Sequence, residues 1–278
     1  AKTHQLISIL EKLYGFKKTN PILGEIRNFH RKEPIVVKIN SDIIKYLEQK
    51  INKESITEDT VIQTLQLLSK IIYFKVYNKK IIDLFFQCIV KNDLIGFTSF
   101  LKIKSLFVYY LNTLNFQNIH IDRYLKQISD CQLEDGGWPK QINIDIESDI
   151  FSTLQIYRTF AANPIWKNKK FLNKSNKFLL NAHMNPSSSK DTIDRWSRLN
   201  VGYKFNNLFE GGTLILLESL LHFEKPNKAK IKSIINWIES IQLHNGYFPY
   251  HANLKTEKNI DTTINVLYQI KRYNLKSI

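Results

Sequence analysis

The chain has 278 residues, 43% of them hydrophobic and 12% aromatic, which is enough for one large core and short for two well-formed domains. Its two cysteines, Cys88 and Cys131, exclude a disulfide framework and favour a cytoplasmic location. The formal net charge of +15 favours an anionic partner. Because no nucleic-acid recognition motif is found, we expect an anionic substrate or peripheral contact with an anionic membrane surface, and no nucleic acid.

Helical periodicity dominates the chain, since apolar residues recur every three or four positions in most segments. The predicted helices are, in chain order, His4–Tyr14, Ser41–Ile51, Glu58–Tyr77, Lys80–Lys91, Phe97–Leu114, Ile121–Cys131, Asp149–Phe160, Lys169–Ala182, Gly211–Phe223, Lys228–Gln242 and Asp261–Tyr273. Only short stretches such as Pro34–Ile39 alternate as a strand would. The pattern predicts an all-α fold in a single domain, residues 1–278.

Two stretches of the sequence repeat each other. The run CQLEDGGWP, which contains Gln132 and Trp138, returns as IQLHNGYFP, which contains Gln242 and Phe248. The two glutamines are 110 residues apart (242 − 132), and with them aligned the apolar positions of the preceding helices coincide. The offset fits two units of about 55 residues, each a pair of helices, and five or six such pairs would close a ring.

Each part of the repeat has a structural task. The Asp-Gly and Asn-Gly pairs supply the positive φ that a sharp reversal needs. The aromatic residue then packs over the turn. An aspartate begins the next predicted helix in both copies, Asp149 and Asp261, and its position predicts an N-cap that also favours the positive end of the helix dipole.

Gln132 to Trp138 resembles the glutamine–tryptophan repeat of squalene and hopene cyclases and related terpene cyclases. Ser148 to Leu154 is similar to the helix that follows such motifs, and the resemblance covers roughly residues 120–275. It implies an α/α toroid (barrel) of five to six helix pairs around an apolar central cavity. Protein prenyltransferase β-subunits share this architecture, so the resemblance bears more on fold than on function.

The resemblance also implies where an acid catalyst would lie. Class II terpene cyclases protonate their substrate with the middle aspartate of Asp-x-Asp-Asp at the start of a helix. The matching run here, Ile146-Glu147-Ser148-Asp149, departs from that pattern, so Asp145, Glu147 and Asp149 are the candidate acids in its place, with capping as the alternative role of Asp149. The Asp-x-Cys with which prenyltransferases hold zinc is absent, and we expect neither a metal nor a cofactor.

Aromatic residues in predicted loops or at helix starts are the candidates for lining a cavity mouth, where their faces would stabilise a passing carbocation. They are Trp196, Tyr203, Tyr250 and His251. Arg195 and Arg198 are spaced to clamp a diphosphate, with an ordinary surface pair as the alternative.

These features predict a terpene-cyclase-like protein that binds an isoprenoid or other lipid-like chain and, if it is active, cyclises it through an acid-generated carbocation. One alternative is a non-catalytic toroid that binds a peptide or protein, which the altered acidic motif favours. The third is a polysaccharide lyase, because Gly136-Gly137-Trp138-Pro139 is similar to a run in helical-toroid pectate lyases and the basic charge would suit polygalacturonate. The sequence leaves the oligomeric state open.

Overall fold

The computed structural model describes residues 43–49, 57–74, 79–91, 93–114, 119–186, 189–199, 212–223, 227–254 and 260–277. These residues form helices and turns with two isolated β-bridges and no β-strand among them, so the all-α class is confirmed for this part of the chain. Contacts divide the chain into an N-terminal unit, Ala1–Phe97, and a C-terminal unit, Thr98–Ile278. Within the described ranges, no helix is both long and apolar enough to cross a membrane.

The N-terminal unit contains α4 (Glu58–Phe74), α5 (Lys79–Lys91) and the short α6 (Leu94–Phe97), and residues 43–49 are helical as well. Apolar side chains three and four residues apart give α4 and α5 one buried face each. The buried side chains include Leu47, Val61, Leu65, Leu68, Ile81, Phe85, Cys88 and Ile89. The unit therefore has an apolar core of its own.

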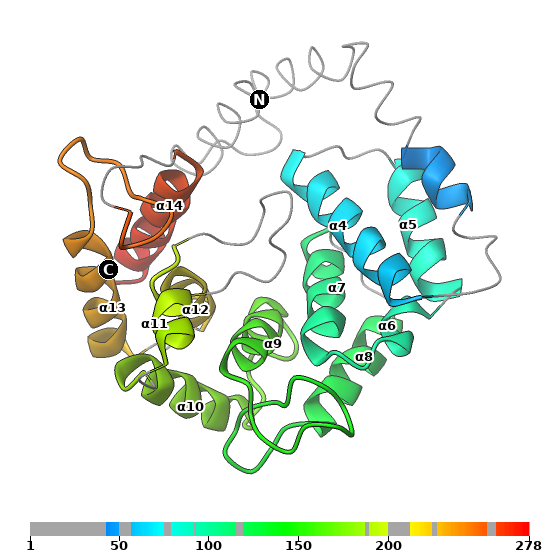
Figure 1. Ribbon diagram of the computed structural model, residues 1–278, viewed down its shortest axis with the longest axis horizontal. Helices are drawn as coiled ribbons and strands as arrows, with labels where there is room; N and C mark the ends of the chain where they lie inside the picture. The colour runs from blue at the N-terminus through cyan, green and yellow to red at the C-terminus, as the bar shows by residue number, and fades with distance from the viewer. Residues whose placement is uncertain are drawn as a thin grey trace. The chain divides into compact units, whose positions relative to one another are not determined.

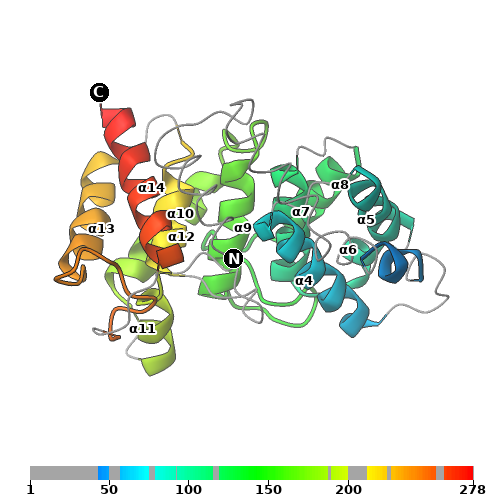
Figure 2. The same ribbon diagram turned by 90° about the horizontal axis from the view of Figure 1, so that it is seen from above.

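The C-terminal unit is an array of two helical layers (Figure 1). Its helices are α7 (Leu101–Thr113), α8 (Ile119–Asp130), α9 (Ile150–Ala162), α10 (Leu172–Met184), α11 (Lys190–Trp196), α12 (Thr213–Leu220), α13 (Lys228–Ser240) and α14 (Ile260–Ser277). The row α7, α9, α12 and α14 lies side by side, and α8, α10 and α13 pack on α7, α9 and α12 from its outer side. Viewed from above, α11 lies near the N-terminal end of α14 (Figure 2).

The two layers differ in how their side chains are buried. The outer helices bury a single stripe, as Ile231, Ile234, Ile235 and Ile238 do on α13. In contrast, every residue from Phe151 to Ala161 on α9 is buried, and α12 is buried along its whole length. A helix that is covered all round belongs to the interior of a fold, so the row α7–α9–α12 is the core of the C-terminal unit.

Most predicted helices of the C-terminal unit are confirmed, with shifted ends. α7 begins at Leu101 and not at Phe97, because Phe100 pairs with Gln141 in an isolated antiparallel bridge. The short helix α11 was not predicted. His4–Tyr14 and Pro34–Ile39 lie outside the described residues. One domain of residues 1–278 stays a prediction.

Candidate functional site

The turn after α8 is held by the amide group of Gln132. Its Nε2 donates to the carbonyl oxygen of Gly136 (3.0 Å), to the carbonyl oxygen of Phe171 (3.3 Å) and to Oγ of Ser175 (2.8 Å). Gly136 has φ 91°, and a Cβ added there would meet the backbone of Lys174 at 2.5 Å, so glycine is required. The glutamine therefore ties the end of α8 to the start of α10.

Trp138 fastens the same turn to α9. Its side chain is fully buried, its indole Nε1 donates to the carbonyl oxygen of Ile128 (2.7 Å), and its ring stacks on Phe160. Its backbone nitrogen donates to Oγ1 of Thr153 (2.8 Å), and its carbonyl oxygen accepts from the nitrogen of Asp149 (2.9 Å). These bonds position the start of α9.

The second copy of the repeat makes the corresponding bonds at its glutamine and at the backbone of its aromatic residue, 110 residues later. Gln242 Nε2 donates to the carbonyl oxygen of Gly246 (2.8 Å), which has φ 80°, and the buried Phe248 donates from its backbone nitrogen to Oγ1 of Thr263 (2.8 Å). Even the β-bridges correspond, because the one at His251 lies 110 residues after the one at Gln141 (251 − 141). The predicted repeat is confirmed.

The two copies differ on their outer side. The first is covered by α10, whereas a Cβ on Gly246 would have nothing within 4 Å and Gln242 is exposed. The first copy is therefore the more tightly constrained of the two.

The three candidate acids lie at or just before the start of α9. Asp149 is its N-cap, with the carboxylate accepting from the backbone nitrogen of Ser152 at 2.7 Å, as the sequence predicted. Asp145 accepts from the backbone nitrogen of Gln141 at 2.9 Å and thus holds its own loop, and Glu147 is exposed. At least two of the three carboxylates therefore have local structural roles.

Lys102 interacts electrostatically with Asp149, Arg195 and Lys140. The carbonyl oxygen of Lys140 accepts from the nitrogen of Leu101 (3.2 Å), which brings Lys140 beside Lys102 on α7. The Arg195 guanidinium lies 5.0 Å from the centre of the Phe151 ring, in the first turn of α9. Burial lowers the pKa of Lys102 to about 8, opposed by the charge of Asp149 and assisted by those of Arg195 and Lys140. Sequence reasoning missed Lys102 and Lys140.

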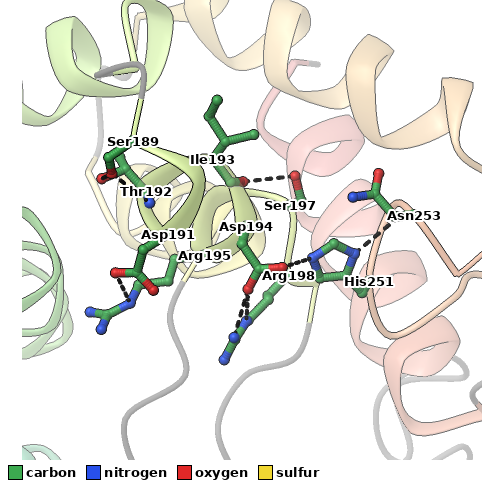
Figure 3. Close-up of polar contacts among 10 residues, drawn as sticks. All are labelled: Ser189, Asp191, Thr192, Ile193, Asp194, Arg195, Ser197, Arg198, His251 and Asn253. Atoms are coloured by element: carbon green, nitrogen blue, oxygen red, sulfur yellow. Dashed lines mark hydrogen bonds and ion pairs between the residues drawn. The ribbon is translucent and has the colours of Figure 1, made fainter.

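Of the two predicted arginines, Arg195 lies in helix α11 and Arg198 lies two residues after its end, and each is paired with the aspartate four residues before it (Figure 3). Arg195 contacts Asp191 (3.1 Å), and Arg198 donates from Nε and Nη2 to Asp194 (3.1 and 2.7 Å). Hydrogen bonding from Arg198 is the largest factor that lowers the pKa of Asp194. Arg198 is thus occupied by an internal partner.

His251 completes this cluster. It is 7% exposed, its Nδ1 accepts from the backbone nitrogen of Asn253 (3.0 Å), and its Nε2 lies 2.9 Å from Asp194 Oδ1 (Figure 3). Because Nδ1 is an acceptor, Nε2 carries the proton and donates to Asp194. Both ring nitrogens are thus used to hold the loop against α11, and this arrangement leaves no lone pair for a general base.

The aromatic candidates for a cavity mouth differ in their exposure. Trp196 is buried, with its ring against Phe151 (5.3 Å) and His183 (4.9 Å), and its carbonyl oxygen accepts from Thr213. Burial lowers the pKa of His183 to about 4. Tyr250 is partly exposed, and its carbonyl oxygen accepts from the nitrogen of Leu199 at 2.9 Å. Tyr203 lies outside the described residues.

A buried ion pair that the sequence analysis missed joins three helices of the inner row. Arg158 on α9 donates to both carboxylate oxygens of Glu218 on α12 (3.2 and 3.0 Å), and the Tyr109 hydroxyl on α7 donates to Glu218 Oε1 (3.0 Å). Burial alone would raise the pKa of Glu218, but mainly the charge of Arg158 holds it below its usual range. The signal in the sequence was that Arg158 and Glu218 are each a single charged residue within a largely apolar helix.

In the part of the chain that the structure describes, no three His, Cys, Asp or Glu side chains are grouped as a metal site. The chain matches no model of a known protein family, and it has no match among the curated proteins or the solved structures.

Proposed function

We propose that the protein is a terpene-cyclase-like α/α toroid that holds an isoprenoid or similar lipid chain. One observation carries this proposal: the repeat built on Gln132 and Gln242 has the same backbone geometry in both copies. In each copy a glutamine closes a turn, and the aromatic that follows is anchored on the next inner helix. That is the structural unit of the family which the sequence resembles.

The layering of the C-terminal unit supports the same proposal. An inner row of α7, α9, α12 and α14, covered by α8, α10 and α13, is what part of such a toroid would contain. Five to six helix pairs closed into a ring are part of the proposal, as is a cytoplasmic location, with which the thiols of Cys88 and Cys131, not joined in a disulfide, agree.

The proposed substrate site lies at the starts of α7 and α9. Lys102, Lys140 and Arg195 would bind an anionic head group there, while the lipid chain extends into the proposed central cavity. If the protein is catalytic, a carboxylic acid among Asp145, Glu147 and Asp149 would give its proton to a substrate alkene, and the carbocation formed would lose a proton after ring closure.

Product analysis tests the catalytic part. The protein is incubated with farnesyl diphosphate, geranylgeranyl diphosphate and squalene, and the organic extracts are separated by gas chromatography and identified by mass spectrometry. We expect cyclised product from the wild type and none from D145N/E147Q/D149N. The acids are replaced by isosteric amides, so that the amide oxygen at position 149 still accepts from the nitrogen of Ser152 and α9 keeps its cap. Equal product from wild type and variant would exclude these acids.

A second candidate is a non-catalytic toroid that binds a peptide or protein partner. The capping bond of Asp149 and the loop bond of Asp145 favour it, because both carboxylates already serve the local structure. This candidate predicts no product from any of the three substrates and no retained lipid. Retention of a lipid without turnover would instead indicate a lipid-binding relative of the cyclases.

A further inference from the structure

The outer surface around α10 carries a dense group of basic residues. Between Arg158 and Asp191 the sequence has no Asp or Glu. The same stretch contains Lys167, Lys169, Lys170, Lys174 and Lys177. Lys170, Lys174 and Lys177 are exposed; Lys174 and Lys177, three residues apart, share one face of α10, and Lys170 lies in the turn just before the helix.

The positive charge of this face is not neutralised internally. Lys170, Lys174 and Lys177 form no ion pair with any acid in the described ranges. Asp122 on α8 lies at the edge of the surface, where its carboxylate accepts from the indole Nε1 of Trp166 at 3.0 Å. An anionic partner would therefore meet free ammonium groups.

The neighbouring helix α13 extends the charge. Lys230 Nζ lies 2.7 Å from Met184 Sδ, which joins the start of α13 to the end of α10. Lys228 and Lys232, on either side of Lys230, are exposed. The basic surface thus covers two adjacent outer helices; its residues are Lys167, Lys169, Lys170, Lys174, Lys177, Lys228, Lys230 and Lys232.

Apolar side chains protrude at both ends of α10. Ile165 is 67% exposed just before the helix, and Met184 is 54% exposed at its last residue. Trp166, beside Ile165, is half-buried, with an apolar ring and a polar nitrogen. Phosphates of a nucleic acid would gain nothing from Ile165 and Met184, whereas the acyl region of a bilayer would bury both.

We infer that this basic surface of α10 and α13 docks the protein on a membrane that contains anionic phospholipid. Lysines lie against the head groups, and Ile165 and Met184 enter the boundary with the acyl chains. The inference goes beyond the proposed function, because it concerns the outer layer and holds for any ligand of the inner one. It also places the protein where a lipid substrate is found.

Vesicle flotation tests the inference. Phosphatidylcholine vesicles are compared with vesicles of phosphatidylcholine and phosphatidylglycerol in a two-to-one ratio. We expect binding to the anionic vesicles alone, and weaker binding as salt is added. Each lysine near an anionic surface strengthens partitioning about fivefold, so K170Q/K174Q/K177Q should weaken it about a hundredfold.

The matched control is K126Q/K190Q/K271Q, which removes the same charge from other surfaces of the C-terminal unit. It should weaken partitioning less than about fivefold. In turn, I165S/M184S should remove the part of the binding that survives high salt. Circular dichroism of each variant verifies that the helices are retained.

Three results would overturn the inference. They are no binding of the wild type to anionic vesicles, equal losses in the two lysine triples, and tighter patch-dependent binding to a DNA duplex than to vesicles. The membrane-docking surface and the proposed substrate site are distinct. If K170Q/K174Q/K177Q loses vesicle binding but still retains farnesyl diphosphate, the docking surface is tested independently of the proposed function.

Discussion

Breaking the buried pair of Arg158 and Glu218 gives the sharpest test of the packing in the inner row. The Arg158 side chain is 3% exposed and that of Glu218 is 11% exposed, with 3.0 Å between Nη2 and Oε2. The Tyr109 hydroxyl and ring contact the two partners, the ring centre lying 4.1 Å from the guanidinium carbon. Glu218→Gln or Arg158→Met would leave the other group charged and buried without its counter-ion.

We expect each single substitution to lower the free energy of unfolding by about 3–5 kcal/mol. In contrast, R158M/E218M removes both charges and replaces them with apolar groups, so it should stay within about 2 kcal/mol of the wild type. The coupling energy from the double-mutant cycle is then about 4 kcal/mol or more. Tyr109→Phe, which removes a single hydrogen bond to a charged group, should cost about 1.5–3 kcal/mol.

Urea unfolding measures these energies. All four tryptophans lie between residues 138 and 237, so tryptophan fluorescence follows the C-terminal unit alone, while far-UV circular dichroism follows the whole chain. If fluorescence and circular dichroism give the same transition, unfolding can be treated as two-state. Single substitutions that each cost less than about 1 kcal/mol and add without coupling would refute the packing described for α7, α9 and α12.

Three further predictions concern single positions. Gly136→Ala should lower the free energy of unfolding by about 3 kcal/mol or more, because the added Cβ meets the backbone of α10 at 2.5 Å. Gly246→Ala should lower it by about 1 kcal/mol, from its positive φ alone. Equal losses in urea unfolding would contradict the different environments of the two turns. Because the pKa of His183 falls to about 4 on folding, the unfolded chain binds more protons between pH 6.5 and 4. Stability should therefore decline as the pH falls through that window, by about 1–3 kcal/mol, and a His183→Gln variant that declines as steeply would rule out this histidine as the cause. Phe248→Trp should fold and show a blue-shifted tryptophan emission, because its indole would donate to the carbonyl oxygen of Ile238 as Trp138 donates to that of Ile128. A variant that is unfolded, or whose emission is red-shifted, would argue against equivalent turns.

Helix positions and the repeat could be predicted because they depend on local patterns. Apolar spacing of three and four residues marks the amphipathic outer helices, and a Gly with positive φ marks each turn. The cap at Asp149 was predictable for the same reason, since a cap bonds to a backbone nitrogen three residues away.

Contacts between distant segments could not be predicted from such patterns. The pair of Arg158 and Glu218 spans 60 residues, and although each is a single charge within a largely apolar helix, nothing local identifies its partner. His251 was selected as an aromatic at a cavity mouth, but its partner Asp194 lies 57 residues away and fixes its tautomer. Lys102 was missed because its neighbours Lys140 and Arg195 come from other parts of the chain.

Native mass spectrometry tests the central claim, that this scaffold holds an isoprenoid chain, most directly. The protein is incubated with farnesyl diphosphate, with squalene, and with pyrophosphate as the head group alone, and is then transferred to the gas phase intact. We expect one retained prenyl ligand per chain, reduced in K102Q/R195Q and unchanged in the control K126Q. No retained farnesyl diphosphate or squalene, or retention of pyrophosphate as strong as that of farnesyl diphosphate, would contradict it.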